Sequence, residues 1–216
     1  MLAERGVPQG DGTGWLYEPK WDGYRAIVYV DGIITIRTRR GLDRTSSFPE
    51  LGGLAEAVDG RRMVLDGELV ACRDGVLDFY ALSGRLAATS PNAARQAARR
   101  APVTFVAFDL LWLDGDRLTR LPLVDRKAAL GGLDLAGPAW QTTAWWADDG
   151  EAVFAACEQR GLEGLVAKRA ASPYRPGKRS KDWLKRKTAE WREVHDPRRH
   201  EAVARSGHGS FRAGAG

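Results

Sequence analysis

The sequence predicts an α+β domain with mainly antiparallel sheets, and three observations support this. Residues 25–37, RAIVYVDGIITIR, place an Asp-Gly pair between two β-rich runs, which is a strong hairpin pattern. Residues 103–113, VTFVAFDLLWL, form a nearly continuous apolar run typical of a buried strand. Helical patterns are few and are interspersed among the strands.

Further strands follow from the same turn and periodicity rules. Residues 62–72 and 75–82 flank the short segment RDG, so we expect them to form a second strand pair. The other expected strands are residues 139–146, 164–169 and 182–188.

Three helices are expected from their end residues. Residues 90–102 form an Ala/Arg-rich helix that begins near a Ser-Pro pair and stops at a proline. Residues 123–133 form a short helix that ends at glycine. Residues 148–161 form a helix with Asp148 or Asp149 at its N-cap and a glycine after its last turn.

The composition is ordinary for a globular protein, with 44% hydrophobic and 28% charged residues. No apolar run approaches the length of a membrane span, and the N-terminus lacks the apolar core of a secretory signal. The two cysteines show no metal-binding spacing. We therefore expect a cytoplasmic protein without membrane attachment.

The basic residues are concentrated near one end of the chain. The net charge is +5, and residues 168–187 hold nine basic side chains and one acidic side chain. Such a block favours a polyanionic partner, with a solvated basic face as the alternative. By composition, we expect residues 1–14 to be an N-terminal arm and residues 15–188 to be one domain. Residues 189–216 are expected to be an atypical tail, helical to about residue 204 and then disordered.

Polar side chains alternate along three of the expected strands. Residues two apart in a strand share a face, and the alternating residues are Glu18, Lys20 and Asp22, then Asp66 and Glu68, then Trp183, Lys185 and Lys187. An edge strand facing water is the alternative for each. Three such strands together predict sheets that line a common cleft.

The cleft so predicted suits phosphate chemistry. Lysines neutralise phosphate, and carboxylates without histidine or cysteine suit Mg²⁺. All three histidines lie in the expected tail, which disfavours histidine or zinc catalysis, and neither glycine-rich phosphate-loop pattern is present. Neighbouring cations favour the neutral form of a lysine, a nucleophile that can attack an α-phosphate and release pyrophosphate.

The order of the segments resembles the adenylation domain of ATP-dependent DNA ligases, members of the lysine-adenylating nucleotidyltransferases. The similar segments are KWDGYR (20–25), TRRG (38–41), LDGELVA (65–71), FVAFDLLWLDG (105–115), EGLVAKR (163–169) and WLKRK (183–187). A lone K-x-D-G is weak, but several motifs in order are strong. The residues within these motifs, together with FPEL at residues 48–51, resemble those of bacterial ligases of the repair and end-joining type.

The resemblance implies a role for each matching residue. Lys20 becomes the lysyl-AMP, and Glu18 contacts the adenine amino group. Arg25 contacts the nucleotide sugar and phosphate, and Arg39 lies near phosphate.

Further along the chain, Glu68 is the implied partner of a ribose hydroxyl. Phe108 and Val166 pack on the two faces of adenine. Lys185 and Lys187 hold the α-phosphate and help to expel pyrophosphate.

The resemblance also implies ATP as AMP donor and Mg²⁺ as cofactor. Glu163 serves the metal with Asp66 as a supporting carboxylate, and Lys168 lies beside the phosphates. The implied fold is the nucleotidyltransferase domain, with two antiparallel sheets, flanking helices and a nucleotide cleft between the sheets.

One departure from the family concerns the C-terminal part. Family ligases continue into an OB domain that carries a last basic motif. Only 29 residues follow Lys187, without the OB pattern. We therefore expect no complete OB domain, and either a truncated or frame-shifted fragment or a separate OB-domain or repair partner. The abrupt start suggests that a preceding domain is also absent.

The leading hypothesis is a monomeric DNA ligase unit of the bacterial nucleoid. It forms lysyl-AMP and transfers AMP to the 5′-phosphate of nicked or broken double-stranded DNA, in DNA repair and recombination. The alternatives are a nucleotide- or DNA-binding remnant with little sealing activity, an RNA-end nucleotidyltransferase, and a basic architectural DNA binder.

Overall fold

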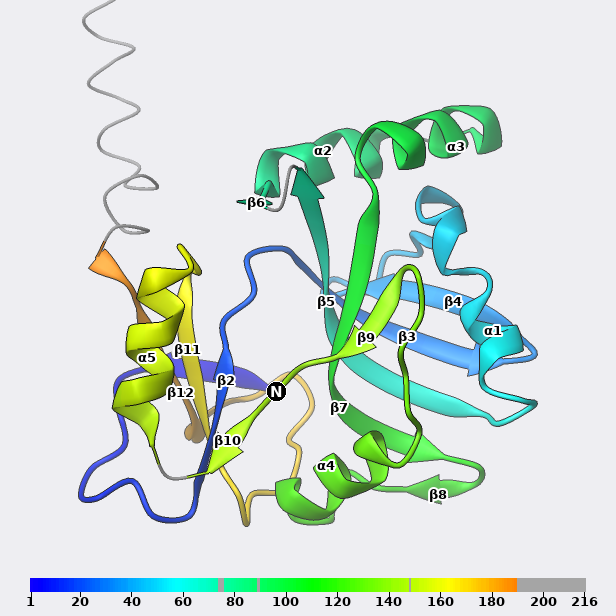
Figure 1. The fold of residues 1–216 in the computed structure, drawn as a ribbon. Coiled ribbons are helices and arrows are strands. Elements are labelled where there is room, and N and C mark those ends of the chain that lie inside the picture. Colours follow the sequence, from blue (N-terminus) through cyan, green and yellow to red (C-terminus); the bar gives the residue numbers. More distant parts are fainter. Residues whose placement is uncertain (74–75, 89, 148, 190–216) are drawn as a thin grey trace, which may run out of the picture.

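The computed structural model describes residues 1–73, 76–88, 90–147 and 149–189 of the chain. Within them the chain forms two β-sheets that face one another across a cavity, with helices around them (Figure 1). The sheets are called sheet A and sheet B. Most strand pairs are antiparallel, and the described parallel pairs are β1 with β12 and β7 with β9. The predicted α+β class is confirmed.

Sheet A joins the two ends of the described chain. In spatial order it contains β1 (Leu2–Arg5), β12 (Arg179–Lys187), β11 (Gly164–Arg169), β2 (Trp15–Pro19) and β10 (Trp146–Ala147).

Sheet B is made from the middle of the chain. Its order is β4 (Ile33–Thr38), β3 (Tyr24–Asp31), β5 (Met63–Arg73), β7 (Val103–Leu113) and β8 (Asp116–Arg117), with β6 (Val76–Leu77) on β5 and β9 (Trp140–Thr142) on β7. The predicted hairpin is β3 and β4, turning at Gly32 with a φ of 69° that favours glycine.

The helices lie on the sheets and at their ends. They are α1 (Leu54–Ala57), α2 (Phe79–Ala87), α3 (Pro91–Arg100), α4 (Leu123–Gly131) and α5 (Gly150–Gln159), with 3₁₀ turns at Thr45–Ser47 and Pro49–Leu51. As predicted, α3 begins at a serine N-cap and α5 at an aspartate, Asp149, whose side chain accepts from the Ala152 amide. These caps satisfy backbone donors that a helix start leaves open.

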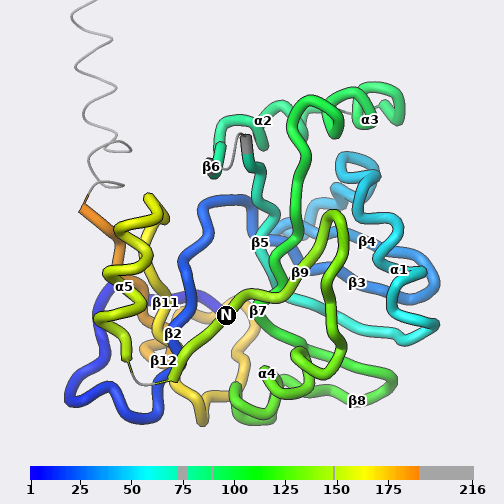
Figure 2. Tube along the Cα trace, in the orientation of Figure 1, coloured from blue at the N-terminus to red at the C-terminus, as the bar shows by residue number. Residues whose placement is uncertain are grey.

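The chain crosses between the sheets where the site lies. It leaves sheet A after β2 and enters sheet B at β3 through residues 20–23, and it returns from β9 to β10 (Figure 2). Helix α4 packs on β7 of sheet B, and its Val124 amide donates to the Ala170 carbonyl just after β11 of sheet A.

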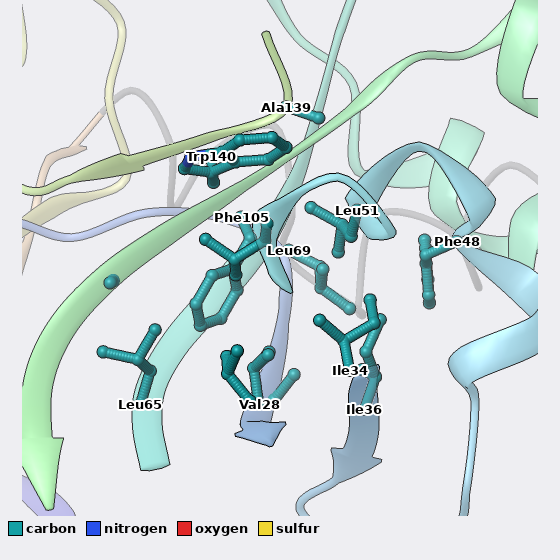
Figure 3. Close-up of a cluster of buried hydrophobic side chains, with 14 of the residues drawn as sticks. Val28, Ile34, Ile36, Phe48, Leu51, Leu65, Leu69, Phe105, Ala139 and Trp140 are labelled. Atoms are coloured by element: carbon teal, nitrogen blue, oxygen red, sulfur yellow. The ribbon is translucent and has the colours of Figure 1, made fainter. Parts of the chain in front are cut away.

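The main hydrophobic core lies on sheet B. Strand β3 alternates with period two, so Val28 is fully buried whereas Tyr29 is exposed. Ile36, Leu65 and Phe105 from the neighbouring strands complete the cluster (Figure 3). A smaller core holds α5 against β2 and β11 of sheet A.

The FPEL segment is anchored by a buried arginine. Arg85 on α2 donates to both Glu50 oxygens at 2.6 and 2.8 Å and to the Ala101 carbonyl at 2.7 Å. Its guanidinium also lies over the Phe48 ring. Since Arg85 is only 1% exposed, these bonds satisfy a charge that would otherwise destabilise the core.

Two strand predictions were wrong in part. Residues 75–82 were expected to be one strand, but β6 ends at Leu77 because the Asp78 side chain caps α2 by accepting from the Ala81 amide. Residues 139–146 were also expected to be one strand, but they form β9 and β10 in different sheets. Periodicity alone does not show when a chain changes sheet.

The expected arm and the expected motif strand also differ from the structure. Within residues 1–14, Leu2–Arg5 forms β1, because it pairs with β12. The strand predicted through Glu18, Lys20 and Asp22 stops at Pro19. Lys20 therefore lies on the crossing between the sheets, with its amide donating to the Gly164 carbonyl at 2.8 Å.

The expected tail lies almost wholly outside the described residues, because residues 190–216 are not among them. In the described part of the chain, no helix is long and apolar enough to span a membrane.

We predict that Gly67 cannot carry a side chain. A Cβ there would lie 2.5 Å from the Phe105 ring and 2.6 Å from the Val106 carbonyl. We expect Gly67→Ala to lower the free energy of unfolding by at least about 2 kcal/mol. In the control Gly84→Ala on α2, the Cβ meets nothing within 4 Å, so we expect a gain of roughly 0.5–1 kcal/mol. Urea denaturation measures both, and equal effects would contradict the packing argument.

Candidate active site

A cavity of about 220 Å³ lies between the two sheets. It brings together most residues that the sequence predicted for the site, namely Glu18, Lys20, Arg25, Arg39, Glu68, Phe108, Val166 and Lys185. Asp66 and Glu163 are outside this lining but form ion pairs with it, to Arg25 and Lys20, and Lys187 pairs with Glu163 in turn.

Each sheet supplies one wall through strand register. On sheet A, Val166 is paired with Glu18 on one side and with Lys185 on the other. On sheet B, Arg25 is paired with Glu68. Directly opposite residues share a face, so residues from three strands of sheet A form one row toward the cavity.

The predicted nucleophile is held by a buried carboxylate. The Lys20 Nζ donates to Glu163 Oε2, and the Lys187 Nζ lies 2.8 Å from Glu163 Oε1. Glu163 is 3% exposed, whereas Lys20 and Lys187 remain partly exposed. One carboxylate therefore positions two ammonium groups at the cavity, although the three residues are far apart in the sequence.

Asp66 positions Arg25. The Arg25 Nε donates to Asp66 Oδ1 at 2.9 Å and Nη2 to Oδ2 at 2.5 Å, and the Tyr174 hydroxyl donates to Oδ2 at 2.7 Å. Burial lowers the pKa of Arg25, but the charge and hydrogen bonds of Asp66 outweigh it and leave that pKa raised. Burial, with the charge of Asp66, raises the pKa of Tyr174. Arg25 therefore stays charged and Tyr174 stays a donor.

The aromatic rings of Phe108 and Trp183 line the cavity beside two cations. The Arg25 guanidinium lies 5.3 Å from the Phe108 ring centre, and the Lys168 Nζ lies 4.3 Å from the rings of both Phe108 and Trp183. Lys168 also pairs with Glu18 at 2.7 Å. Lys168 thus lies with the residues expected around the base, whereas the resemblance placed it beside the phosphates.

Burial shifts the protonation of three groups that line the cavity. Burial raises the pKa of Glu68 to about 8, against the opposing charges of Lys20 and Arg25. Burial lowers the pKa of Lys168 to about 8, although Glu18 opposes it. The pKa of Lys185 is lowered by burial and by the nearby charges of Lys20 and Lys187. The cavity is therefore most positive below about pH 8.

The carboxylates differ in their fit to Mg²⁺. No group of three or more His, Cys, Asp or Glu ligands forms among the described residues. Mg²⁺ commonly uses only one or two carboxylates together with substrate phosphates and water. Glu163 contacts Lys20 of the cavity lining, but it is 3% exposed and its oxygens contact Lys20 and Lys187, so a metal held there would replace one of these lysine contacts. Asp66 is fully buried with both oxygens bound by Arg25 and Tyr174. This arrangement does not support the metal role expected for Asp66.

Sequence reasoning missed one residue of the site's charge network. Lys127 on α4 is buried, and its Nζ lies 2.7 Å from Glu18 Oε1. Its position within an ordinary amphipathic helix gave no sign of this contact. Trp21 was not assigned a role either; it lines the cavity, and its indole N–H donates to the Thr143 hydroxyl at 3.0 Å.

Among curated proteins, relatives of this chain are bacterial DNA ligases. The chain is 37% identical over 197 residues to the multifunctional non-homologous end joining DNA repair protein LigD of Mycobacterium tuberculosis, covering 90% of this chain and 24% of LigD. It is 41% identical over 172 residues to DNA ligase C2 of Mycolicibacterium smegmatis, covering 77% and 48%. The chain thus spans about a quarter to a half of these relatives.

Solved structures of the same kind share the fold. The ligase domain of M. tuberculosis LigD superposes with a TM-score of 0.71 at 34% identity, covering 86% of this chain and 58% of that one. A mycobacterial DNA ligase D complexed with ATP gives 0.68 at 35% identity, covering 86% and 60%. The predicted nucleotidyltransferase fold is confirmed.

The protein-family model described as the ATP dependent DNA ligase domain matches residues 3–187. This span includes every motif quoted from the sequence. This match confirms the family suggested by the order of those motifs. The chain therefore belongs to the ATP-dependent DNA ligases, as their adenylation domain, and it is similar to the ligase domain of LigD.

Proposed function

We propose that this chain transfers AMP from ATP to its own Lys20 and then to the 5′-phosphate of a DNA break. The observation that carries this proposal is the position of Lys20. Its side chain enters the cavity, and a buried carboxylate, Glu163, holds it together with Lys187. The relative that was solved with ATP supports the choice of nucleotide.

The row across sheet A suggests how ATP is oriented. Phe108 and Val166 line the cavity near Glu18, so they are placed to hold the base. Lys185 follows Val166 in register and lies toward the phosphate end with Lys20. Glu68 on the opposite wall is placed for the ribose hydroxyls, and Arg39 at the rim for phosphate.

Positioning and charge neutralisation supply the chemistry. The Lys20 ammonium gives one proton to its partner Glu163, the amine so formed attacks the α-phosphorus to make a P–N bond, the bond to the pyrophosphate oxygen breaks, and the second proton leaves to solvent. Lys185 and Lys187 neutralise the charge of the reacting phosphate. Bound through Glu163 and phosphate oxygens, Mg²⁺ would neutralise further charge. The 5′-phosphate of DNA then displaces Lys20, and a 3′-hydroxyl finally displaces AMP.

The proposed DNA substrate is nicked or broken double-stranded DNA. The basic side chains of β12 and the preceding loop, within residues 168–187, provide a surface for its phosphates. The names of the relatives place them in DNA repair and end joining. We propose the same process for this chain, acting as a monomer in the bacterial cytoplasm at the nucleoid.

We predict that Lys20 is the site of covalent AMP. After incubation with α-labelled ATP and Mg²⁺, the protein should carry a label that survives a denaturing gel and alkali but is released by acid, as for a P–N bond. Lys20→Ala should carry no label, because the proposal assigns the attacking amine to Lys20 and only charge neutralisation to Lys185 and Lys187. The control Lys181→Ala removes an exposed lysine of β12 and should label normally.

Other labelling results would favour the alternative functions. Binding of ATP without a covalent label indicates a nucleotide-binding remnant. Preferential labelling by GTP, or transfer to RNA ends, indicates an RNA-end nucleotidyltransferase. Salt-sensitive DNA binding with no response to ATP indicates a basic architectural protein.

We predict that nucleotide binding weakens above about pH 8. As the pH rises through that value, Glu68 gains a negative charge while Lys168 loses a positive charge. Both changes disfavour an anion. The affinity for α,β-methylene-ATP, which cannot transfer AMP, should fall severalfold between about pH 7 and about pH 9. Calorimetric titration measures this, and Glu68→Gln should show a shallower decline; a flat profile would contradict the charge assignment.

A further inference from the structure

Two adjacent cations on α4 are bound by buried carboxylates of different sheets. Arg126 donates to both oxygens of Asp109 on β7 of sheet B, at 2.7 and 2.9 Å. Lys127 places its Nζ 2.7 Å from Glu18 Oε1 on β2 of sheet A. All four side chains are at most 3% exposed. Helix α4 therefore connects the two walls of the cavity through side-chain charge.

Stability of the fold does not by itself explain why a lysine is buried at position 127. Removing two charges from water costs free energy that their attraction does not reliably recover, so an apolar side chain is often at least as stabilising. Arg126 already connects α4 to sheet B and also donates to carbonyls at Leu121 and Ser172. Lys127 contributes a different contact, because it reaches the carboxylate of Glu18 at the cavity wall.

The Glu18 carboxylate is held from two sides. Lys127 contacts Oε1, and Lys168 contacts Oε2 at 2.7 Å. A carboxylate offers about four acceptor positions, so two ammonium groups fix its orientation without using all of its capacity. The Lys127 contact is close but is not aligned as a hydrogen bond, so Oε1 is a buried acceptor whose capacity is not used by the described residues of the protein.

This orientation bears on which purine fits. Adenine carries an amino donor where guanine carries a carbonyl acceptor. A fixed carboxylate at the base end of the cavity accepts from the adenine amino group and repels the guanine oxygen. A carboxylate that can rotate away repels guanine less.

We propose that Lys127 is a positioning residue that fixes Glu18 as the acceptor for the amino group of adenine, and so sets the preference for ATP over GTP. The proposal rests on the proposed function in that the cavity binds a nucleotide with its base next to Glu18. Lys127 acts through Glu18 and does not touch the reacting atoms.

The test compares the dissociation constants for ATP and GTP at one pH. Binding is measured through the change in intrinsic tryptophan fluorescence, since Trp21 and Trp183 line the cavity. Wild type should prefer ATP by roughly tenfold to a hundredfold, as for a hydrogen bond to a charged group. Lys127→Met should bring the ratio close to one, mainly by weakening ATP binding. Lys127→Arg should restore most of the preference, since it keeps the charge.

A matched control separates positioning from stability. Leu130 lies on the same helix in the core of sheet B, so Leu130→Ala should lower the melting temperature without changing the ATP-to-GTP ratio. In a Glu18→Gln background, adding Lys127→Met should change the ratio no further. An unchanged ratio in Lys127→Met, or the same loss with and without Glu18, would overturn the proposal.

The outcome also distinguishes this proposal from the proposed function. If the wild-type protein discriminates between the nucleotides but forms no covalent label, the proposal of AMP transfer is overturned. The role of Lys127 is then still decided by the ratio of the two dissociation constants in its variants. If the wild-type protein binds neither nucleotide, both proposals are overturned.

Discussion

The arrangement of the site depends on the charged contacts that α4 makes with both sheets. Arg126 and Lys127 are neighbours in the chain, so their carboxylate partners, Asp109 and Glu18, are tied to one short helix. The cavity lies between the sheets that carry these partners. Buried ion pairs are costly unless their geometry is well satisfied, and here that geometry fixes the position of one wall relative to the other.

The same principle organises the rest of the cavity. Glu163 holds two lysines, and Asp66 holds Arg25 through two bonds. These carboxylates compensate cations that burial would otherwise disfavour. Preorganised cations lose little reorganisation energy when an anionic substrate enters, which is how such sites stabilise phosphoryl transfer.

Local patterns predicted most of the fold, and the failures share a cause. The β3–β4 hairpin and the buried strand β7 follow from period and turn residues within single segments. The division of residues 139–146 between two sheets, and the pairing of Leu2–Arg5 with β12, depend on partners far away in the sequence. The helix that replaces the expected strand after Leu77 depends on one aspartate cap.

The sequence by itself determined the family, the two-sheet α+β fold and the identity of most residues that line the cavity, because these are recorded in motif order and in alternation along strands. Only the tertiary structure decided which of those residues contact one another, and so which role each can have. It showed that Asp66 supports Arg25, that Lys168 lies with Glu18 and the aromatic rings, and that Lys127 belongs to the network. Pairing between charges is set by distance in space, and a pattern along one segment does not contain that distance.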